Sequence, residues 1–241
     1  MASGNVQFHH FTEGVENQML KSYPLTDLHR SKSKIIILFF IYSTVLAGQD
    51  SFINRSITLT SSEKKLLAQG EIIVRDLSTD QKAGKTVEAI GLIKAGIDDV
   101  YQVLLNFEDY NEFMPNVAEV AIFKKDSNNA ILNYTNELPL NKVKKYRLDM
   151  SYQKKKNEAM FKWEMIEWPG LRKSETINNT TGYWLLKNYP YKHNHIIALY
   201  HVYSDPGPVP LGLGWIVDIL TYNSVPEIVI NTRARVYSVS N

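Results

Sequence analysis

The chain has 241 residues, 44% of them hydrophobic, which is enough for one well-filled domain or two small ones, and we expect one. A net charge of +2 argues against nucleic-acid binding, because the basic surfaces of nucleic-acid binders concentrate far more charge. The lack of cysteine excludes disulfides, thiolate nucleophiles and cysteine-based zinc sites.

The longest apolar run, "KIIILFFIYSTVLAGQD", begins at Lys34 and follows the basic residues Arg30 and Lys32. Its uninterrupted part has roughly 14 residues, whereas a transmembrane helix needs about 20. Small side chains at Val45 and Ala47 have the spacing of a cleavage site near its end. The pattern resembles a secretory signal peptide and predicts export to a periplasmic or extracellular space.

This leader is predicted to span residues 1–49, and a single domain is predicted to span residues 50–241. The stretch before the apolar run is long for a signal peptide, so translation could start at Met19 instead of Met1. An uncleaved membrane anchor at residues 35–48, or a merely buried segment, is the alternative to export.

After the leader, Ser61 or Ser62 is expected to cap a short helix that ends at Gly70. Residues 71–77 and 86–95 then read as two strands joined by the polar turn "STDQKAGK". Together these strands predict a hairpin.

Two short helices are predicted next. From Ile97 the apolar residues recur at helical spacing, and acidic residues occupy the first turn. The following stretch, "NFEDYNEFMPNVAEV", places Phe107, Tyr110 and Met114 on one side of a helix that Pro115 ends. We expect these side chains to close one end of the domain.

Beyond this proline the side chains alternate with a period of two for a long stretch. Tyr146, Leu148 and Met150 share one face of a strand, while Lys145 and Arg147 share the other, which predicts an antiparallel sheet with one buried and one wet face. The predicted strands are 117–124, 130–138, 143–153, 159–166, 175–187 and 195–204.

The segment "SDPGPVPLGLG" ends the sheet, and a long helix is predicted to follow it, with a kink at Pro226. A twisted sheet must bury its apolar face on something, and this last helix is the one element long enough. The predicted fold is therefore α+β, a curved antiparallel sheet wrapped around a long C-terminal helix. Whether the space between them is a cavity or solid packing is left open.

Several stretches resemble a known family: "LTSSEKKLLAQGEIIVRD", "FEDYNEFMPNVAEV", "TTGYWLL" and "DPGPVPLG…VPEIV". They are similar to the START-like superfamily, also called SRPBCC or helix-grip, near its coenzyme Q-binding and polyketide cyclase/dehydrase branch. The similarity spans roughly residues 59–236 and is most specific at Tyr110–Val117 and at Gly182 and Trp184. The resemblance implies a deep hydrophobic pocket between the sheet and the C-terminal helix.

The superfamily contains lipid carriers, quinone-binding proteins and aromatase/cyclases, so the resemblance leaves the activity open. We expect binding or transport of a lipid, a quinone or another hydrophobic small molecule, by a monomer with no cofactor and with transient membrane contact. The residues expected to line the pocket are Tyr134, Tyr146, Trp163, His201, Tyr203 and Trp215.

The alternative is an aromatase/cyclase- or lyase-type enzyme that uses the same pocket, for which His201, Arg147 and Glu137 are the candidate polar groups. We predict no catalytic residue and no metal site, because His193 and His195 lack a nearby acidic partner. No nucleophile motif or phosphate-binding loop is present in the sequence.

Overall fold

The computed structural model describes residues 55–80, 83–207 and 222–239. These residues belong to one compact unit, Gln49–Asn241, whereas the other unit, Met1–Gly48, which contains most of the predicted leader, lies outside them. None of the described helices is long and apolar enough to cross a membrane.

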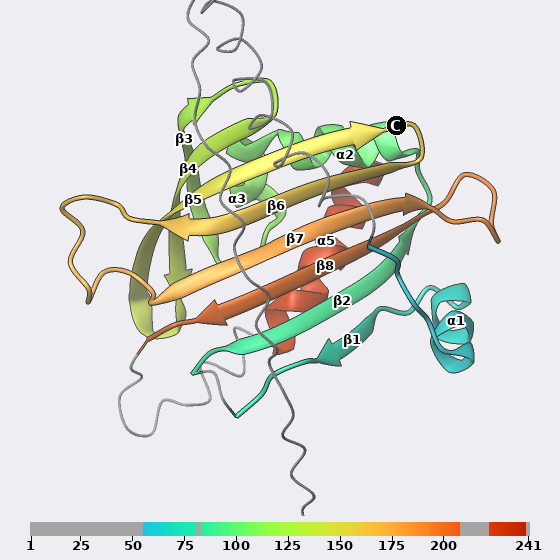
Figure 1. The fold of residues 1–241 in the computed structure, drawn as a ribbon, viewed down its shortest axis with the longest axis horizontal. Coiled ribbons are helices and arrows are strands. Elements are labelled where there is room, and N and C mark those ends of the chain that lie inside the picture. Colours follow the sequence, from blue (N-terminus) through green and yellow to red (C-terminus); the bar gives the residue numbers. More distant parts are fainter. Residues whose placement is uncertain (1–54, 81–82, 208–221, 240–241) are drawn as a thin grey trace, which may run out of the picture. The chain divides into compact units, whose positions relative to one another are not determined.

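The described strands form one antiparallel sheet in the order β1-β2-β8-β7-β6-β5-β4-β3 (Figure 1). Every prediction of a strand is confirmed, with ends that shift by a few residues. The strands are β1 (Ile73–Asp76), β2 (Lys85–Ile93), β3 (Val117–Lys125), β4 (Asn129–Leu138), β5 (Lys142–Lys155), β6 (Glu158–Ile166), β7 (Asn179–Asn188) and β8 (Ile196–Asp205).

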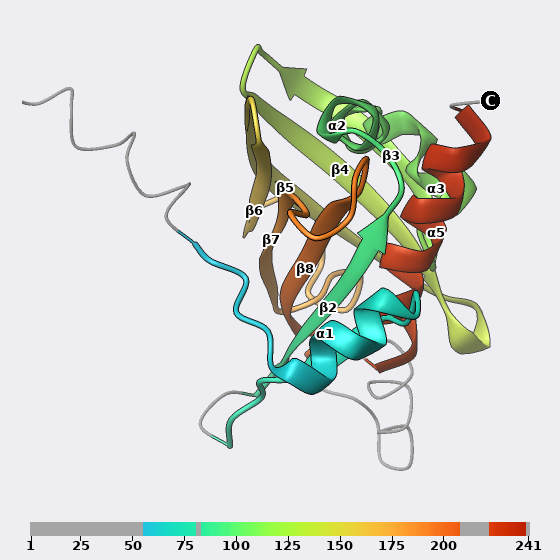
Figure 2. The ribbon, with the colours of Figure 1, turned by 90° about the vertical axis from the view of Figure 1, so that its right-hand side faces the viewer.

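The described helices include three longer ones, α1, α2 and α5, and several short turns. They are α1 (Ser61–Ala68), α2 (Ile97–Leu105), η1 (Phe107–Asp109), α3 (Tyr110–Phe113), η2 (Pro139–Asn141) and α5 (Ser224–Val239). The helix α5 lies across the inner face of the sheet against β2 and β8, and α2 and α3 pack beside it (Figure 2). The predicted α+β, helix-grip architecture is thus confirmed.

The start of α1 differs from the prediction by one residue. Its N-cap is Thr60, since the Thr60 hydroxyl accepts a hydrogen bond from the Glu63 backbone N–H at 3.2 Å and the Glu63 carboxylate accepts one from the Thr60 N–H at 2.8 Å. This reciprocal pair is a capping box, whose spacing is fixed by the glutamate at the third helical position. The same glutamate therefore excludes Ser61 and Ser62 as the cap.

The predicted long C-terminal helix is seen in part. Pro226 is the third residue of α5, and the two residues directly before α5 are also helical, in a π-helical turn. The segment before Tyr222, including Trp215, lies outside the described residues, so the predicted kink stays a prediction.

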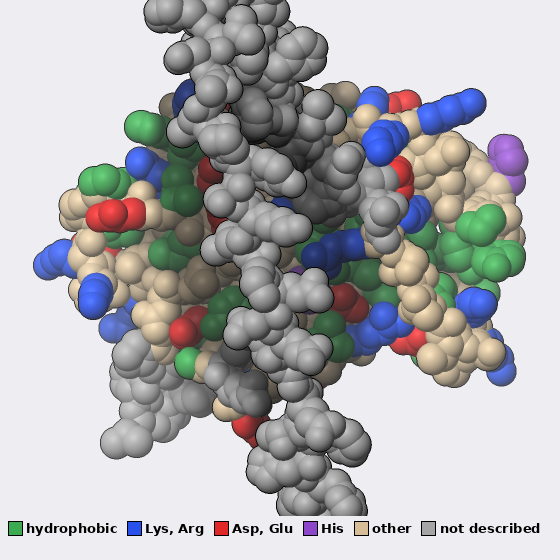
Figure 3. Space-filling model, viewed as in Figure 1, with side chains coloured by type: hydrophobic (Ala, Val, Ile, Leu, Met, Phe, Trp, Pro, Cys, Tyr) green, Lys and Arg blue, Asp and Glu red, His purple; other side chains and the backbone are tan. Residues whose placement is uncertain are grey.

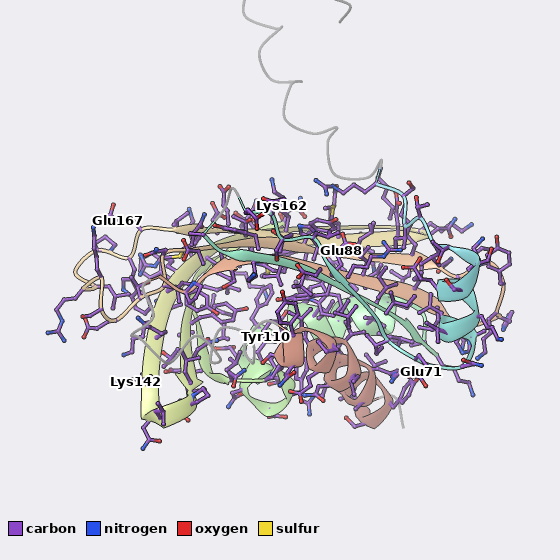
Figure 4. The ribbon with its side chains drawn as sticks, turned by 90° about the horizontal axis from the view of Figure 1, so that it is seen from below. Glu71, Glu88, Tyr110, Lys142, Lys162 and Glu167 are labelled. Carbon is purple, nitrogen blue, oxygen red and sulfur yellow. The ribbon has the colours of Figure 1, made fainter. Side chains whose placement is uncertain are left out.

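Just before Pro115, the side chains of Tyr110, Phe113 and Met114 are buried, and Figure 4 shows Tyr110 between the sheet and α5. The Tyr110 hydroxyl donates a hydrogen bond to the Leu104 carbonyl oxygen at 2.6 Å. After the proline, Asn116 adopts a left-handed backbone conformation with φ 62° and donates from its amide to the Ser224 hydroxyl at 2.9 Å. The sharp exit into β3 is thereby tied to the first turn of α5.

The sheet is not one-sided throughout, which corrects the prediction. On the outer face of β2, β7 and β8, a second apolar cluster forms beneath α1 and includes Leu67, Ile90, Leu185 and Leu199. Elsewhere on the outer face, basic, acidic and hydrophobic side chains are interspersed (Figure 3). The strands under α1 are therefore apolar on both faces, while β5 shows the predicted alternation of buried and exposed residues.

Candidate functional site

A cavity of about 200 Å³ lies between the inner face of the sheet and the start of α5. Strands β2 and β4 to β8 form its wall, and the stretch from Tyr110 to Val117 and the start of α5 close it from the other side. The cavity thus occupies the position that the sequence left open between a pocket and solid packing.

Aromatic rings form much of the wall. The rings of Tyr134 and Tyr146 are stacked with centroids 5.3 Å apart, and those of Trp163 and Tyr200 with centroids 5.5 Å apart. Trp184 packs against Tyr200 at 4.8 Å. Aromatic pairs in these geometries attract one another, and the wall that they form is largely apolar.

The structure brings three of the predicted pocket residues together. Tyr134, Tyr146 and Trp163 all line the cavity. His201 and Tyr203 do not line it; they lie on the outer face of β8, because residues of a strand alternate between the two faces. Ligand binding by any of these residues stays a prediction.

Sequence reasoning missed the cavity-facing residues of β8, which are Tyr200, Val202 and Ser204. The reason is that β8 is apolar on both faces, with Ile197 and Leu199 packed in the cluster beneath α1, so its alternation carried no signal. The signal lay in the neighbouring strands, since β7 contributes Trp184 to the cavity and Trp184 pairs with Tyr200.

The polar candidates for catalysis also lie away from the cavity. Arg147 donates a hydrogen bond to the Asn133 side chain at 2.7 Å and stacks over the Phe123 ring, and Glu137 is exposed. Neither residue is part of the cavity lining. Among the described residues, no group of three or more histidine and acidic side chains could hold a metal ion.

His201 instead belongs to a charged network on the outer face. Its Nδ1 lies 3.0 Å from Glu88 Oε1, its ring stacks on Tyr183, and Arg75 reaches the other Glu88 oxygen at 3.5 Å. The hydrogen bond from His201 holds the pKa of Glu88 below its ordinary value, and burial opposes this effect. Glu88 is 8% exposed, so the network stabilises the fold on the face opposite the cavity.

Glu88→Gln is expected to lower the free energy of unfolding by about 1–3 kcal/mol at pH 7, because it removes the charge that pairs with Arg75 and His201. A lowered pKa in the folded state stabilises above the ordinary value of 4.5, and this stabilisation is lost as the pH falls through the folded pKa. Urea unfolding of both proteins should therefore show a difference that shrinks below about pH 4.5. A constant difference down to about pH 3 would contradict this role of Glu88.

The cavity holds few groups that titrate near neutral pH. Burial raises the pKa of the tyrosines in its wall, Tyr110, Tyr134, Tyr146 and Tyr200. Burial also lowers the pKa of the Lys144 ammonium, and no carboxylate or imidazole occurs among the described lining residues. The arrangement suits binding of a largely apolar body.

Part of the chain matches a known protein family. Residues 93–186 match the family described as "Polyketide cyclase / dehydrase and lipid transport". No curated protein matches the chain.

Solved structures show the same fold. A STAR-related lipid transfer protein from Xanthomonas axonopodis superposes with a TM-score of 0.59 at 19% identity, covering 69% of this chain and 93% of that one. For human StAR-related lipid transfer protein 5 the TM-score is 0.57 at 11% identity, with 71% and 84% covered. For human STARD10 it is 0.58 at 13% identity, with 77% and 82% covered. The chain therefore has the START-like, helix-grip fold of these structures.

Proposed function

We propose that the protein binds and carries a hydrophobic small molecule, such as a lipid or a quinone, in the cavity between the sheet and α5. The observation that supports this proposal is a cavity of about 200 Å³ with a mostly aromatic and aliphatic wall. Its described lining contains no carboxylate or imidazole. Removing apolar ligand surface from water contributes about 25 cal/mol per Å², which is the driving force of such a site.

The comparisons support carriage without identifying the ligand. The matched structures from X. axonopodis and human are named as lipid transfer proteins, and the family description names lipid transport. The same description also names polyketide cyclases and dehydrases.

A cyclase-type enzyme is the second candidate, and one observation favours it. The Tyr134 and Tyr200 hydroxyls face the cavity, and neither makes a hydrogen bond within the described part of the chain. Buried donors of this kind can stabilise negative charge that develops on a substrate oxygen. Turnover of a poly-β-keto substrate that is lost in Tyr134→Phe would favour the enzyme, whereas a carrier loses at most affinity.

The direct test is to purify the protein, extract it with organic solvent and identify the released molecules by mass spectrometry. A bound lipid or quinone at near-stoichiometric amount is the expected result. Repeatedly empty extracts, together with no uptake of added lipids or quinones, would count strongly against carriage.

Filling the cavity provides a second test. Val202→Trp adds an indole to the inner face of β8 and is expected to weaken uptake by roughly tenfold or more, because the ring takes up space that the ligand needs. Ligand titration followed by tryptophan fluorescence measures the affinity. Val74→Trp, at an exposed position of β1, is the matched control and should leave uptake unchanged. Equal affinities in both variants would place the ligand elsewhere.

We also propose that the protein is exported as a monomer and contacts membranes transiently, on the basis of the leader pattern and the lysine-rich hairpin around β5. Amino-terminal sequencing of the mature protein tests export, and a mature chain that begins before Ile35 would contradict it. Gel filtration tests the monomer, and flotation with vesicles tests membrane contact.

A further inference from the structure

The cavity changes character along its length. Around Trp184, Tyr200 and Met150 its wall is aromatic and aliphatic. At the end where α5 begins, the wall instead carries polar side chains at the strand ends. These are Lys85, Asn136, Lys144, Thr180 and Ser204.

The sheet register groups these polar residues. Lys85 pairs with Ser204, which pairs in turn with Thr180, and on the other side Asn136 pairs with Lys144. Directly paired residues of antiparallel strands have side chains about 4.5–5.5 Å apart at Cβ on the same face. The polar end of the cavity is therefore built by the sheet itself.

The charge at this end is unbalanced at Lys144, whereas Lys85 lies close enough to the Asp76 carboxylate to help lower the pKa of that group. The described lining of this end contains two ammonium groups, of Lys85 and Lys144, and no carboxylate. Lys144 Nζ donates to the backbone carbonyl oxygens of Ser174 at 3.0 Å and Thr176 at 2.8 Å, and a lysine ammonium has a third donor. These two bonds hold the charge in place without neutralising it.

Other cations of the described structure are paired differently. Arg75, Lys187 and Arg235, each half-buried, lie within salt-bridge distance of carboxylates. No such pair forms at Lys144 within the described ranges, although burial already lowers its pKa. A half-buried cation without a counterion is stabilised by any anion that approaches it.

The neighbouring amide adds a further donor. The Asn136 side-chain oxygen accepts a hydrogen bond from the Tyr146 hydroxyl at 3.2 Å. This bond leaves the amide nitrogen, a donor, as the remaining group of the side chain. The groups available to a ligand beside Lys144 are thus donors, which match a carboxylate or a phosphate.

We propose that the ligand is an anionic amphiphile, whose apolar body lies among the aromatic rings and whose single acidic group binds Lys144, with its cross-strand partner Asn136 beside it. This inference rests on the proposed function and specifies its ligand class. A volume of about 200 Å³ is below the 300–1,000 Å³ of drug-sized pockets, which favours one chain or ring system over two acyl chains.

The test compares two probes that share one alkyl chain but differ in the charge of the head group, dodecanoic acid and its methyl ester, by titration of the full chain. We expect the acid to bind more tightly, and Lys144→Gln to weaken the acid by about tenfold or more while leaving the ester unchanged. Lys145→Gln is the matched control, because Lys145 is the next residue of β5, is exposed and is not part of the lining. Lys144→Arg should retain the preference for the acid.

Dodecyl phosphate in place of the acid shows whether a carboxylate or a phosphate is preferred. Equal binding of acid and ester, or equal losses in Lys144→Gln and Lys145→Gln, would overturn the anionic ligand. Carriage itself would stand in that case if Val202→Trp still blocked the ester. Failure of every probe to bind would count against both proposals.

Discussion

Phe107→Ala is expected to lower the free energy of unfolding by about 3–5 kcal/mol, the range for large-to-small changes at fully buried aromatic positions. Phe107 is 1% exposed, and its ring centroid lies 5.8 Å from those of both Tyr110 and Tyr152. The substitution leaves a cavity between the short helices and β5. Guanidinium unfolding with an unchanged m-value measures the loss.

Phe123→Ala is the matched control for this prediction. Phe123 is 62% exposed on β3, and its one described ring contact is with the Arg147 guanidinium. Its loss is expected to cost less than about 1 kcal/mol, the value of an exposed cation–π contact. Similar losses in the two variants would mean that the stretch around Phe107 does not hold the domain together.

Gly182→Ala is expected to destabilise the sheet by about 1–3 kcal/mol or more, the usual cost of overpacking. A Cβ atom at this position would overlap the backbone carbonyl oxygen of His201 and the indole ring of Trp163. The carbonyl belongs to the ladder between β7 and β8 and cannot move alone, so the indole must shift into the cavity. Unfolding curves measure the first effect, and tryptophan emission with ligand titration measures the second.

Thr181→Ala serves as the control, because Thr181 is the adjacent residue of β7 and its side chain lies on the opposite face. It should cost less than about 1 kcal/mol and leave the tryptophan emission unchanged. A normal emission spectrum and normal affinity in Gly182→Ala would show that the Trp163 ring does not depend on the glycine.

Much of the fold was predictable because its signals are local. The alternation of Tyr146, Leu148 and Met150 predicted β5 and its buried face, and the helical spacing from Ile97 predicted α2. With the strand order along the chain and one long final helix, few compact arrangements were available. The position of Pro115 at the exit from α3 followed in the same way.

The cavity lining was harder to predict because it depends on which strands pair. His201 was expected to line the pocket, but it lies on the opposite face of β8 from Tyr200. Lys144 was not among the residues predicted to line the pocket, although it lies two residues before Tyr146 on the same strand and so faces inward. That signal was present in the sequence, whereas the cover that α1 gives to the outer face was not.

The strand order has a consequence for how the protein is made. Strand β2 lies near the start of the domain, yet its inner neighbour is β8, roughly 110 residues later in the chain. At about 5–20 residues per second, a ribosome leaves the β1–β2 hairpin without that neighbour for several seconds. Its unpaired edge, rich in Ile and Val, is open to pairing with other chains during this interval. Synthesis, and not the finished domain, is therefore where aggregation is expected to begin.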